Sequence, residues 1–508
     1  MTQTQVKISL ANLCSDLIQL AQLPEVMITD LALDSRKVKP GSLFFAYPGH
    51  ETDGRLYIGH ALQQGAVAIL YEDDESFTLA IPSDYQAIPC IAVKGLSALI
   101  GPMAARFYNY PSQKMRVFGI TGTSGKSSCS LFLAAALHDE QQKAGVLGTI
   151  GNGIYGAMQE SSHTTLDAIS LQKTLASLQN QGVQNIAMEV SSHALCQGRV
   201  NGLQFDTAIF TNLSHEHLDY HGNFTHYAAA KRRLFNFPDL QAAVINADDP
   251  YGQQWLQELN GKLPVYAYTL DSKLGKTSPV PTVYVQQMQL STHGIAANVI
   301  TPWGAGILHA KQLGRFNLSN LLAVLTALLA RGMPLEQALA KLADLPQVPG
   351  RMESFGGEAL PTVIVDYAHK PEALKQVLLT LRDCGTGKLW CVFGCGGNRD
   401  RTKRPIMGQL AEQYADYLIV TDDNPRREDP KQIVAEILQE MQAPHAVIVE
   451  HDRERAIAHA INCARPQDII LVAGKGHETY QIIGEQKILF SDALTVQRLL
   501  AEKQKLEE

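Results

Sequence analysis

The hydrophobic and polar positions of this chain alternate between two patterns. Short runs rich in β-branched and other apolar residues alternate with segments whose apolar residues recur at helical spacing. This alternation predicts an α/β fold with largely parallel sheets. In the middle of the chain the expected strands are RVFGIT (116–121), NIAMEV (185–190), TAIFT (207–211) and AAVIN (242–246), and the first of them is followed by a glycine-rich loop and the expected helix SLFLAAALHDE (130–140).

The last part of the chain repeats the strand pattern. Each of its expected strands ends in polar or glycine-rich sequence. Because ligands of open parallel sheets bind beyond the carboxyl ends of the strands, the chemistry is expected in these loops. The strands are TVIVDY (362–367), LWCVFG (389–394), DYLIVT (416–421) and DIILVAG (468–474).

Two polar breaks divide the pattern. The segment NYPSQKM (109–115) has the composition of a linker, and LPQVPGR (345–351) combines two prolines with a glycine. Together with a length of 508 residues, they predict three domains, at 1–110, 111–347 and 348–508. The most apolar run, LLAVLTALLA (321–330), is too short to cross a bilayer and predicts a buried helix.

Composition narrows the function classes. Hydrophobic residues make up 45% of the chain, charged residues 18%, and the net charge is −7. These values are ordinary for a globular protein and argue against a nucleic-acid or polybasic membrane role. The eight cysteines include no Cys-x-x-Cys pair, and we expect reduced thiols. Because no signal peptide is visible, we expect a cytoplasmic protein with no membrane insertion.

The segment GITGTSGKSS (119–128) has the features of a phosphate-binding loop. A strand enters it and a helix leaves it, so backbone N–H groups and the helix N-terminus can surround phosphate oxygens. Lys126 can reach the terminal phosphates, and the Ser127 hydroxyl can bind Mg²⁺. The spacing is not the strict Walker pattern, because Gly119 is one residue too far upstream. The alternative, a Gly-Ser turn that happens to contain a lysine, is disfavoured by the flanking strand and helix.

Further charged residues follow two neighbouring strands. Glu189 ends an apolar strand, where a carboxylate needs a partner, and His217 and Asp219 come just after another strand. An acidic group close to the loop serine is the expected completion of a Mg²⁺ site. From the residues alone, His215 and His221 are expected to bond within their loop. Lys231 is expected to be a solvated helix residue.

Together these segments resemble the Mur ligase family. The resemblance implies a small N-terminal α/β domain, a central P-loop-type domain with a mostly parallel sheet, and a C-terminal Rossmann-like domain. It also implies a reaction in which ATP converts a carboxylate into an acyl phosphate that an amine then attacks. The motifs, in family order, are TGTSGKS, MEVSSHAL, TNLSHEHLDYHG, HYAAAKRRLF, VINADD, GRFNLSN, PGRME, VDYAHKPEAL, GCGGNRD, DNPRRED and GKGHE.

The motif DNPR (423–426) resembles the branch of the family that adds diaminopimelate rather than lysine. Diaminopimelate carries one carboxylate more than lysine, and a guanidinium fork binds a carboxylate with two parallel hydrogen bonds. Alone, DNPRRED could equally be an Asn-Pro turn with surface charges. The resemblance implies as substrates ATP, UDP-N-acetylmuramoyl-L-alanyl-D-glutamate and meso-diaminopimelate, with Mg²⁺ as cofactor and a monomeric protein.

The resemblance also implies residue roles. The expected catalytic residues are Lys126, Glu189, His217 and Lys231. The expected ATP-binding residues are Thr121, Gly122, Thr123, Ser124, Gly125, Lys126, Ser127, Asn317, Asn320, Arg351 and Asp366. The nucleotide-sugar peptide is expected at Leu33, Ser35, His50, Glu51, Thr52, Thr164, Thr165, Ser191, Gln197 and Arg199. Diaminopimelate is expected at Arg399, Asp423, Asn424, Pro425, Arg426, Gly474 and Glu478. The metal is expected at Ser127, Glu189, His217 and Lys231, the last modified to a carbamate, so the resemblance reverses the solvated role given to Lys231 above.

The chain departs from the family pattern in two places. The loop has TGTSGKSS where the family more often has TGTNGKTT. Ser124 and Ser127 keep the size or the hydroxyl of the family's residues, so we expect phosphate and metal binding to survive. His163 stands where family members often have asparagine, so a contact there stays open. Two alternatives also stay open. The chain could be another amide ligase of this architecture, such as a folylpolyglutamate synthase or a different Mur step, or a P-loop switch or motor.

Overall fold

The computed structural model describes residues 7–18, 24–49, 52–74, 77–79, 81–161 and 163–507. The expected site residues His50 and Glu51 lie outside these ranges. The chain forms two compact units, Met1–Tyr268 with Ser278–Pro281 and Thr269–Thr277 with Thr282–Glu508. This division groups residues by their contacts and does not test the three domain boundaries expected from the sequence. Those three domains stay a prediction.

The first unit begins with a small four-stranded parallel sheet in the order β3-β4-β5-β6. All of β4 is buried because side chains of both its faces enter a core, Leu43 and Phe45 on one side and Phe44 and Ala46 on the other. Helix α3 (Leu96–Phe107) packs on the first face and α2 (Ile58–Gln63) on the second. The strands are β3 (Asp30–Ala32), β4 (Ser42–Ala46), β5 (Ala66–Glu72) and β6 (Cys90–Val93).

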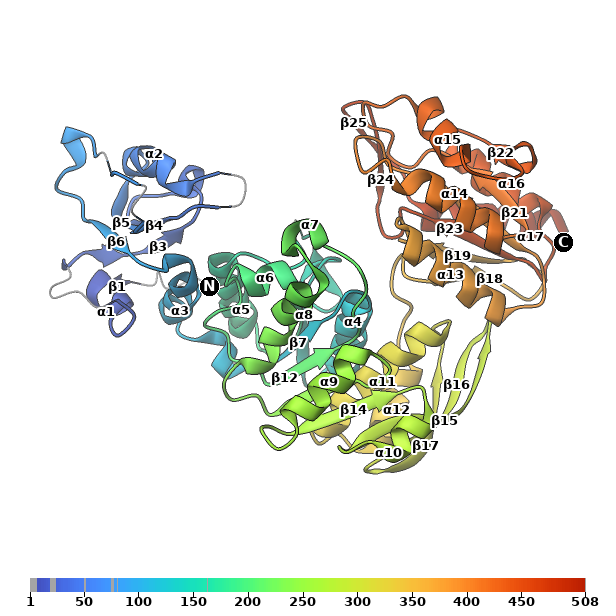
Figure 1. Ribbon diagram of the computed structural model, residues 1–508, viewed down its shortest axis with the longest axis horizontal. Helices are drawn as coiled ribbons and strands as arrows, with labels where there is room; N and C mark the ends of the chain where they lie inside the picture. The colour runs from blue at the N-terminus through green and yellow to red at the C-terminus, as the bar shows by residue number, and fades with distance from the viewer. Residues whose placement is uncertain are drawn as a thin grey trace. The chain divides into compact units, whose positions relative to one another are not determined.

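A larger sheet follows, in the order β10-β9-β8-β11-β7-β12-β13-β14. Figure 1 labels its strands β7, β12 and β14. From β8 to β14 neighbouring strands are parallel, so their carboxyl ends share one edge. The strands expected in the middle of the chain are thus confirmed. They are β7 (Arg116–Thr121), β8 (Lys143–Leu147), β9 (Asn152–Ile154), β10 (Ala157–Gln159), β11 (Val183–Glu189), β12 (Thr207–Phe210), β13 (Ala242–Asn246) and β14 (Val265–Thr269).

The helix expected at 130–140 is α4, Lys126–Leu137, and both of its ends differ from the expectation. It begins earlier because Gly125, at φ +85°, adopts the left-handed conformation just before it. It ends at Leu137 because His138 is extended. The helix therefore starts inside the glycine-rich loop.

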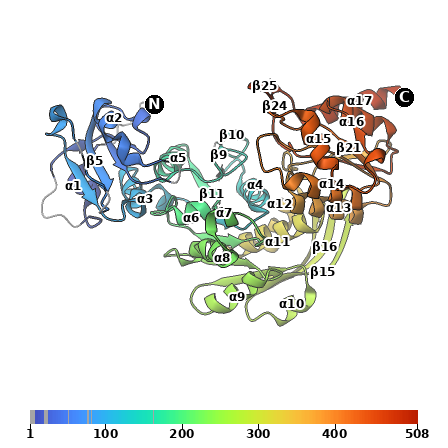
Figure 2. The ribbon, with the colours of Figure 1, turned by 45° about the horizontal axis from the view of Figure 1, so that its top comes forward.

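The second unit contains the antiparallel strands β15 (Thr282–Ser291), β16 (Gly294–Thr301) and β17 (Gly304–Ala310). Figure 2 shows β15 and β16 side by side. Helix α11 (Arg315–Ala330) includes the apolar run 321–330 and is buried there, as expected. Among the described residues no helix is long and apolar enough to span a membrane.

The unit's second sheet has the order β18-β19-β23-β20-β21-β22. It is parallel except for β18, and separate apolar clusters cover its two faces. The loops after β19, β20, β21 and β23 therefore lie at one edge, which confirms the expected arrangement of strands. Its strands are β18 (Glu353–Gly356), β19 (Thr362–Asp366), β20 (Leu389–Phe393), β21 (Tyr417–Val420), β22 (Ile448–Val449) and β23 (Ile469–Ala473), and a hairpin of β24 (Tyr480–Ile483) and β25 (Gln486–Leu489) follows.

Candidate active site

The glycine-rich loop is fixed against the segment that follows the neighbouring strand β12. Thr123 N–H donates to the carbonyl of Asn212 at 2.8 Å, and Ser124 N–H donates to the Asn212 side chain at 2.9 Å. A Cβ on Gly122 would lie 1.9 Å from Thr211 Oγ1, so only glycine allows this approach. Asn212 and Thr211 were not named among the expected site residues, although the pairing of parallel strands β7 and β12 places their loops together.

Two lysines meet at this loop. Lys126 Nζ donates to the carbonyl oxygens of Gly122 (2.9 Å) and Thr123 (2.7 Å), and Lys231 Nζ donates to the same Gly122 oxygen at 2.6 Å. Lys231 lies on α8 (Phe224–Arg232), is only 2% exposed and stands over the ring of Tyr227. Burial lowers the pKa of Lys231 well below its usual value, and the nearby charge of Lys126 lowers it further. A solvated Lys231, as the residues alone suggested, is therefore wrong.

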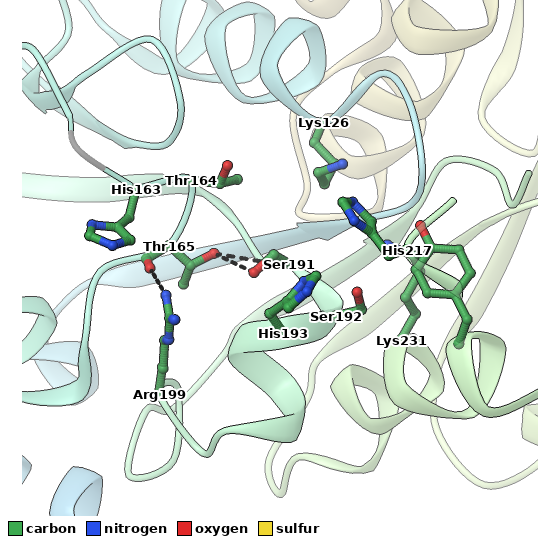
Figure 3. Close-up of a pocket in the computed structure, with 11 residues that line it drawn as sticks. Lys126, His163, Thr164, Thr165, Ser191, Ser192, His193, Arg199, His217 and Lys231 are labelled. Carbon is green, nitrogen blue, oxygen red and sulfur yellow. Dashed lines mark hydrogen bonds between the residues drawn. The ribbon is translucent and has the colours of Figure 1, made fainter. Parts of the chain in front are cut away.

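A cavity of 260 Å³ opens beside these lysines in the first unit (Figure 3). Its lining comes from the loops after several parallel strands and from α8, as expected for a site at the carboxyl edge of the sheet. Of the residues expected from the sequence, it brings together Lys126, Thr164, Thr165, Ser191, Arg199, His217 and Lys231. His163, whose contact was left open, also lines it, with Ser192, His193 and Tyr227.

One wall of the cavity is a polar network. The Arg199 guanidinium donates to the Thr165 carbonyl at 2.9 Å and to the Gln197 side chain at 2.8 Å. Thr165 Oγ1 donates to the Glu189 carbonyl, and Ser191, which caps α6 (Ser192–Cys196), lies 3.3 Å from the same hydroxyl. The guanidinium is thus held by neutral groups, and its charge has no described carboxylate partner, which suits the binding of an anion.

Glu189 is buried, with 1% exposed, at the end of β11. Its Oε1 accepts the Thr149 N–H at 2.8 Å, and its Oε2 accepts the Thr149 hydroxyl at 3.3 Å. Among the described residues no group of three or more His, Cys, Asp or Glu side chains is arranged to hold a metal.

The rings of His217, Tyr220 and His221 form a cluster around His193, which was not among the expected site residues. The ring of His193 lies 4.9 Å from that of His217, 4.1 Å from that of Tyr220 and 5.5 Å from that of His221. Burial, with the neighbouring positive groups, lowers the pKa of His193 to about 4. His221 bonds Ser192 of another element at 3.0 Å instead of its own loop. The only available signal was the position of His193 within the motif MEVSSHAL.

The described members of the expected N-terminal set, Leu33, Ser35 and Thr52, are not among the residues that line this cavity. Ser35 Oγ lies 3.0 Å from His60 Nδ1, and Thr52 Oγ1 lies 3.3 Å from the Tyr57 hydroxyl. Leu33 packs partly buried against that sheet's core.

In the second unit, the expected ATP residues occupy two places. Asn317 and Asn320 are buried on α11, where the Asn320 amide donates to Asn317 at 3.4 Å. Asp366 ends β19 and accepts the N–H groups of Met352 and Ala368, each at 2.8 Å. Burial raises the pKa of Asp366, and the charge of Arg351 opposes this shift.

The loops after β20, β21 and β23 bring the expected diaminopimelate residues together. Asn424 donates to Glu478 Oε2 at 3.0 Å, and Arg426 Nη1 donates to the Gly397 carbonyl at 3.0 Å. Arg426 has φ +53°, a rare conformation for a non-glycine residue, and the hairpin holds it there because its N–H donates to the Ile482 carbonyl. The remaining members are Arg399, exposed in the GCGGNRD loop; Pro425 and Asp423, both buried; and Gly474, whose added Cβ would lie 3.4 Å from Asp423 Oδ2.

Arg404, Lys475 and Arg453 are buried cations of this region that were not expected. Arg404 on α14 (Lys403–Tyr414) has no exposed side-chain surface. It binds both oxygens of Glu428 at 2.7 and 2.8 Å and Glu436 at 2.6 Å. Lys475 is equally buried, between Asp423 and Glu478. A sequence pattern cannot distinguish such residues from the solvated cations beside them, such as Arg401.

Three family models match the chain. They are described as the Mur ligase family catalytic domain over residues 27–108, the Mur ligase middle domain over 120–328, and the Mur ligase glutamate ligase domain over 350–476.

Individual proteins are similar over nearly the whole chain. A protein of Coxiella burnetii named UDP-N-acetylmuramoyl-L-alanyl-D-glutamate–2,6-diaminopimelate ligase is 45% identical over 476 residues, 94% of this chain and 96% of that protein. A protein of Ectopseudomonas mendocina with the same name is 46% identical over 476 residues, with the same two shares. A solved structure so named matches with a TM-score of 0.72 and 34% identity, covering 98% of this chain and 99% of that one.

Proposed function

This chain belongs to the Mur ligase family, and on that premise we propose that it uses ATP to add meso-diaminopimelate to UDP-N-acetylmuramoyl-L-alanyl-D-glutamate. The relatives' names describe the ligation of these two substrates. The observation that carries the proposal for this chain is the cavity where the cationic groups of Lys126 and Arg199 and the buried amine of Lys231 lie beside a phosphate-type loop. Such a site suits a nucleotide and a carboxylate together.

The reaction balances in two steps. The acceptor's carboxylate oxygen attacks the γ-phosphorus of ATP, the bond to the β-phosphate oxygen breaks, and an acyl phosphate and ADP form. The amine of diaminopimelate then attacks the acyl carbon, and the resulting tetrahedral intermediate expels phosphate and loses a proton to form the amide. Lys126 and the N–H groups of the loop offset the charge of the phosphates, and Arg199 holds an anionic group of the acceptor. Fixing both reactants in attack geometry supplies several kcal/mol of the barrier.

The Lys231 amine is proposed to be modified to a carbamate. Burial lowers the pKa of the Lys231 amine, and the neutral form of that amine reacts with CO₂ to form a carbamate and release one proton, which provides an anionic oxygen ligand. Ser127, Glu189, His217 and this carbamate would hold Mg²⁺, which when bound neutralises phosphate charge. Carbamylation also removes the repulsion between Lys231 and Lys126, whose amines share the Gly122 carbonyl.

The loops after β20, β21 and β23 carry the residues that we propose select diaminopimelate as the amine. Arg426 and Arg399 would bind the distal carboxylate of diaminopimelate, and Glu478 and Asp423 its ammonium group. Lysine lacks that carboxylate and would leave the guanidinium without its partner. Asn424, Pro425 and Gly474 complete the pocket.

The other proposed contacts follow the family pattern. Leu33, Ser35, His50, Glu51 and Thr52 would bind the nucleotide sugar, together with Thr164, Thr165, Ser191 and Gln197. ATP would also contact Asn317, Asn320, Arg351 and Asp366. We propose further that the enzyme is a cytoplasmic monomer.

Phosphate release with each substrate omitted in turn tests the proposal. We expect release only when ATP, the UDP-linked dipeptide and diaminopimelate are all present. Hydrolysis of ATP alone would favour a P-loop switch or motor, and equal use of other acceptors would favour another amide ligase of this architecture.

A further inference from the structure

Lys475 lies among the residues of the proposed diaminopimelate pocket. It follows Gly474 in the loop after β23, and its side chain has no exposed surface. Neither the motifs nor the family resemblance described above gives it a role, although its neighbours Gly474 and Glu478 have one.

The ammonium group of Lys475 connects three polar side chains. Its Nζ donates to Asn424 Oδ1 at 3.2 Å and to Glu478 Oε2 at 3.1 Å, and it lies 3.6 Å from Asp423 Oδ1. The Asn424 amide donates to the same Glu478 oxygen at 3.0 Å. Asn424 Oδ1 also accepts the N–H of Ile482 in the hairpin, so its orientation is fixed from both sides.

These contacts determine which carboxylate oxygen of Glu478 can accept a hydrogen bond from a ligand. Both described bonds to Glu478 end on Oε2, which leaves Oε1 as the oxygen with capacity for a ligand ammonium. Replacing a buried ion pair by apolar residues is often neutral for stability, so the retention of a buried lysine here calls for another reason. Precise orientation of a binding carboxylate is such a reason.

We propose that Lys475 is a positioning residue for amine selection. It holds Asn424 and Glu478 in the arrangement that accepts the ammonium group of diaminopimelate, and it acts through them without touching the substrate. This inference rests on the proposed function.

Asp423 gives the inference a pH-dependent signature. Burial raises the pKa of the Asp423 carboxyl, and the charges of Arg453 and Lys475 lower it. Without Lys475 the pKa of Asp423 rises further, so at low pH the carboxyl becomes neutral and its attraction for an ammonium group is lost. The other charged or titratable groups that act on Asp423 or feel its charge are Arg453, Glu478, Asp492, Tyr367 and Cys395.

The test compares Lys475→Met, which removes the charge at similar volume, with Lys475→Arg, which keeps it. Steady-state kinetics with each substrate varied separately are measured from about pH 6 to about pH 9. We expect Lys475→Met to raise the KM for diaminopimelate roughly 10- to 100-fold and to leave the KM values for ATP and the UDP-linked dipeptide within about twofold. The raised KM should fall as pH rises, and Lys475→Arg should recover part of the loss. An unchanged KM for diaminopimelate, or an equal rise for all three substrates, would overturn the inference.

A double-mutant cycle with Glu478→Gln keeps the test valid if Lys475→Met folds poorly. Lys475→Gln is then used, with melting temperatures measured for every variant. If Lys475 acts through Glu478, the double variant should be no worse than Glu478→Gln alone; additive losses contradict the inference. A wild-type enzyme that fails to ligate diaminopimelate overturns the proposed function and this inference with it. Normal wild-type ligation with unaffected Lys475 variants overturns the inference alone.

Discussion

Lys126 and Lys231 donate to one carbonyl oxygen, that of Gly122, at 2.9 and 2.6 Å. Two ammonium groups at one acceptor repel each other, and because Lys231 is buried and Lys126 is not, Lys231 is the one whose pKa falls. The phosphate loop therefore carries an amine of lowered pKa directly beside Lys126. This pairing connects the geometry of the loop to the proposed carbamate.

Replacement of Lys231 tests that connection. Lys231→Ala should reduce turnover by roughly three orders of magnitude, because it removes a group that acts in the transition state. Lys231→Arg, which keeps a cation but cannot form the carbamate, should be as inactive. Phosphate release measures both, and native mass spectrometry should find an added CO₂ on the wild type only. Normal turnover of either variant would rule out the carbamate.

Gly122 should not tolerate a side chain. In Gly122→Ala the new Cβ would meet Thr211 Oγ1 at 1.9 Å, so the loop must move away from the Asn212 segment. We expect loss of nucleotide binding, measured by calorimetry, with a lower melting temperature. Gly156→Ala is the matched control, since Gly156 also has a positive φ, +84°, but an added Cβ finds nothing within 4 Å. Equal effects of the two substitutions would show that the close approach is unimportant.

Arg404 should matter for stability far more than its neighbour Arg401, although both contact Glu436. Arg404→Met leaves two carboxylates without their buried cation and should cost about 3–5 kcal/mol in the free energy of unfolding. Arg401→Met removes an exposed ion pair and should leave that free energy unchanged within error. Urea denaturation measures both, and a similar loss in the two variants would contradict the assignment.

The ion pair between Arg404 and Glu428 also predicts that the free energy of unfolding falls in acid. The hydrogen bonds from Arg404 lower the pKa of Glu428 from its usual 4.5 to about 2. The unfolded chain therefore binds the proton first, so the stability from Glu428 is present above about pH 4.5 and is lost as pH falls towards 2. Urea denaturation at several pH values should show a smaller acid-dependent loss for Glu428→Gln than for the wild type. An equal loss of stability in acid for the wild type and Glu428→Gln would contradict this prediction.

The parts of the site that follow directly from strand periodicity could be predicted from the sequence. Strand ends fix which loops share an edge, which is why the phosphate loop with Lys126 and the carboxylate of Glu189 could be expected at one edge before their contacts were known. Thr165 and Ser191 were expected there only from the family resemblance. Burial of individual cations could not be predicted, because Lys231, Arg404 and Lys475 occupy sequence positions that usually face solvent. Their burial depends on packing between elements distant in sequence, which periodicity does not encode.

The cluster around His193 escaped prediction for the same reason. Its rings come from α6 and from the segment after β12, which includes the short helix α7 (Leu218–His221), and no local pattern signals that these approach one another. The helix boundary at Lys126 was missed because it depends on the conformation of a single glycine, Gly125.

The central claim is that the forked cation Arg426 selects the amine. Wild-type protein and Arg426→Ala are each offered meso-diaminopimelate and lysine with ATP and the UDP-linked dipeptide, and mass spectrometry detects the products. We expect the wild type to ligate diaminopimelate and to reject lysine, and Arg426→Ala to lose roughly 100-fold or more in kcat/KM for diaminopimelate while its KM for ATP stays near normal. Equal use of lysine by the wild type, or unchanged ligation of diaminopimelate by the variant, would contradict the account.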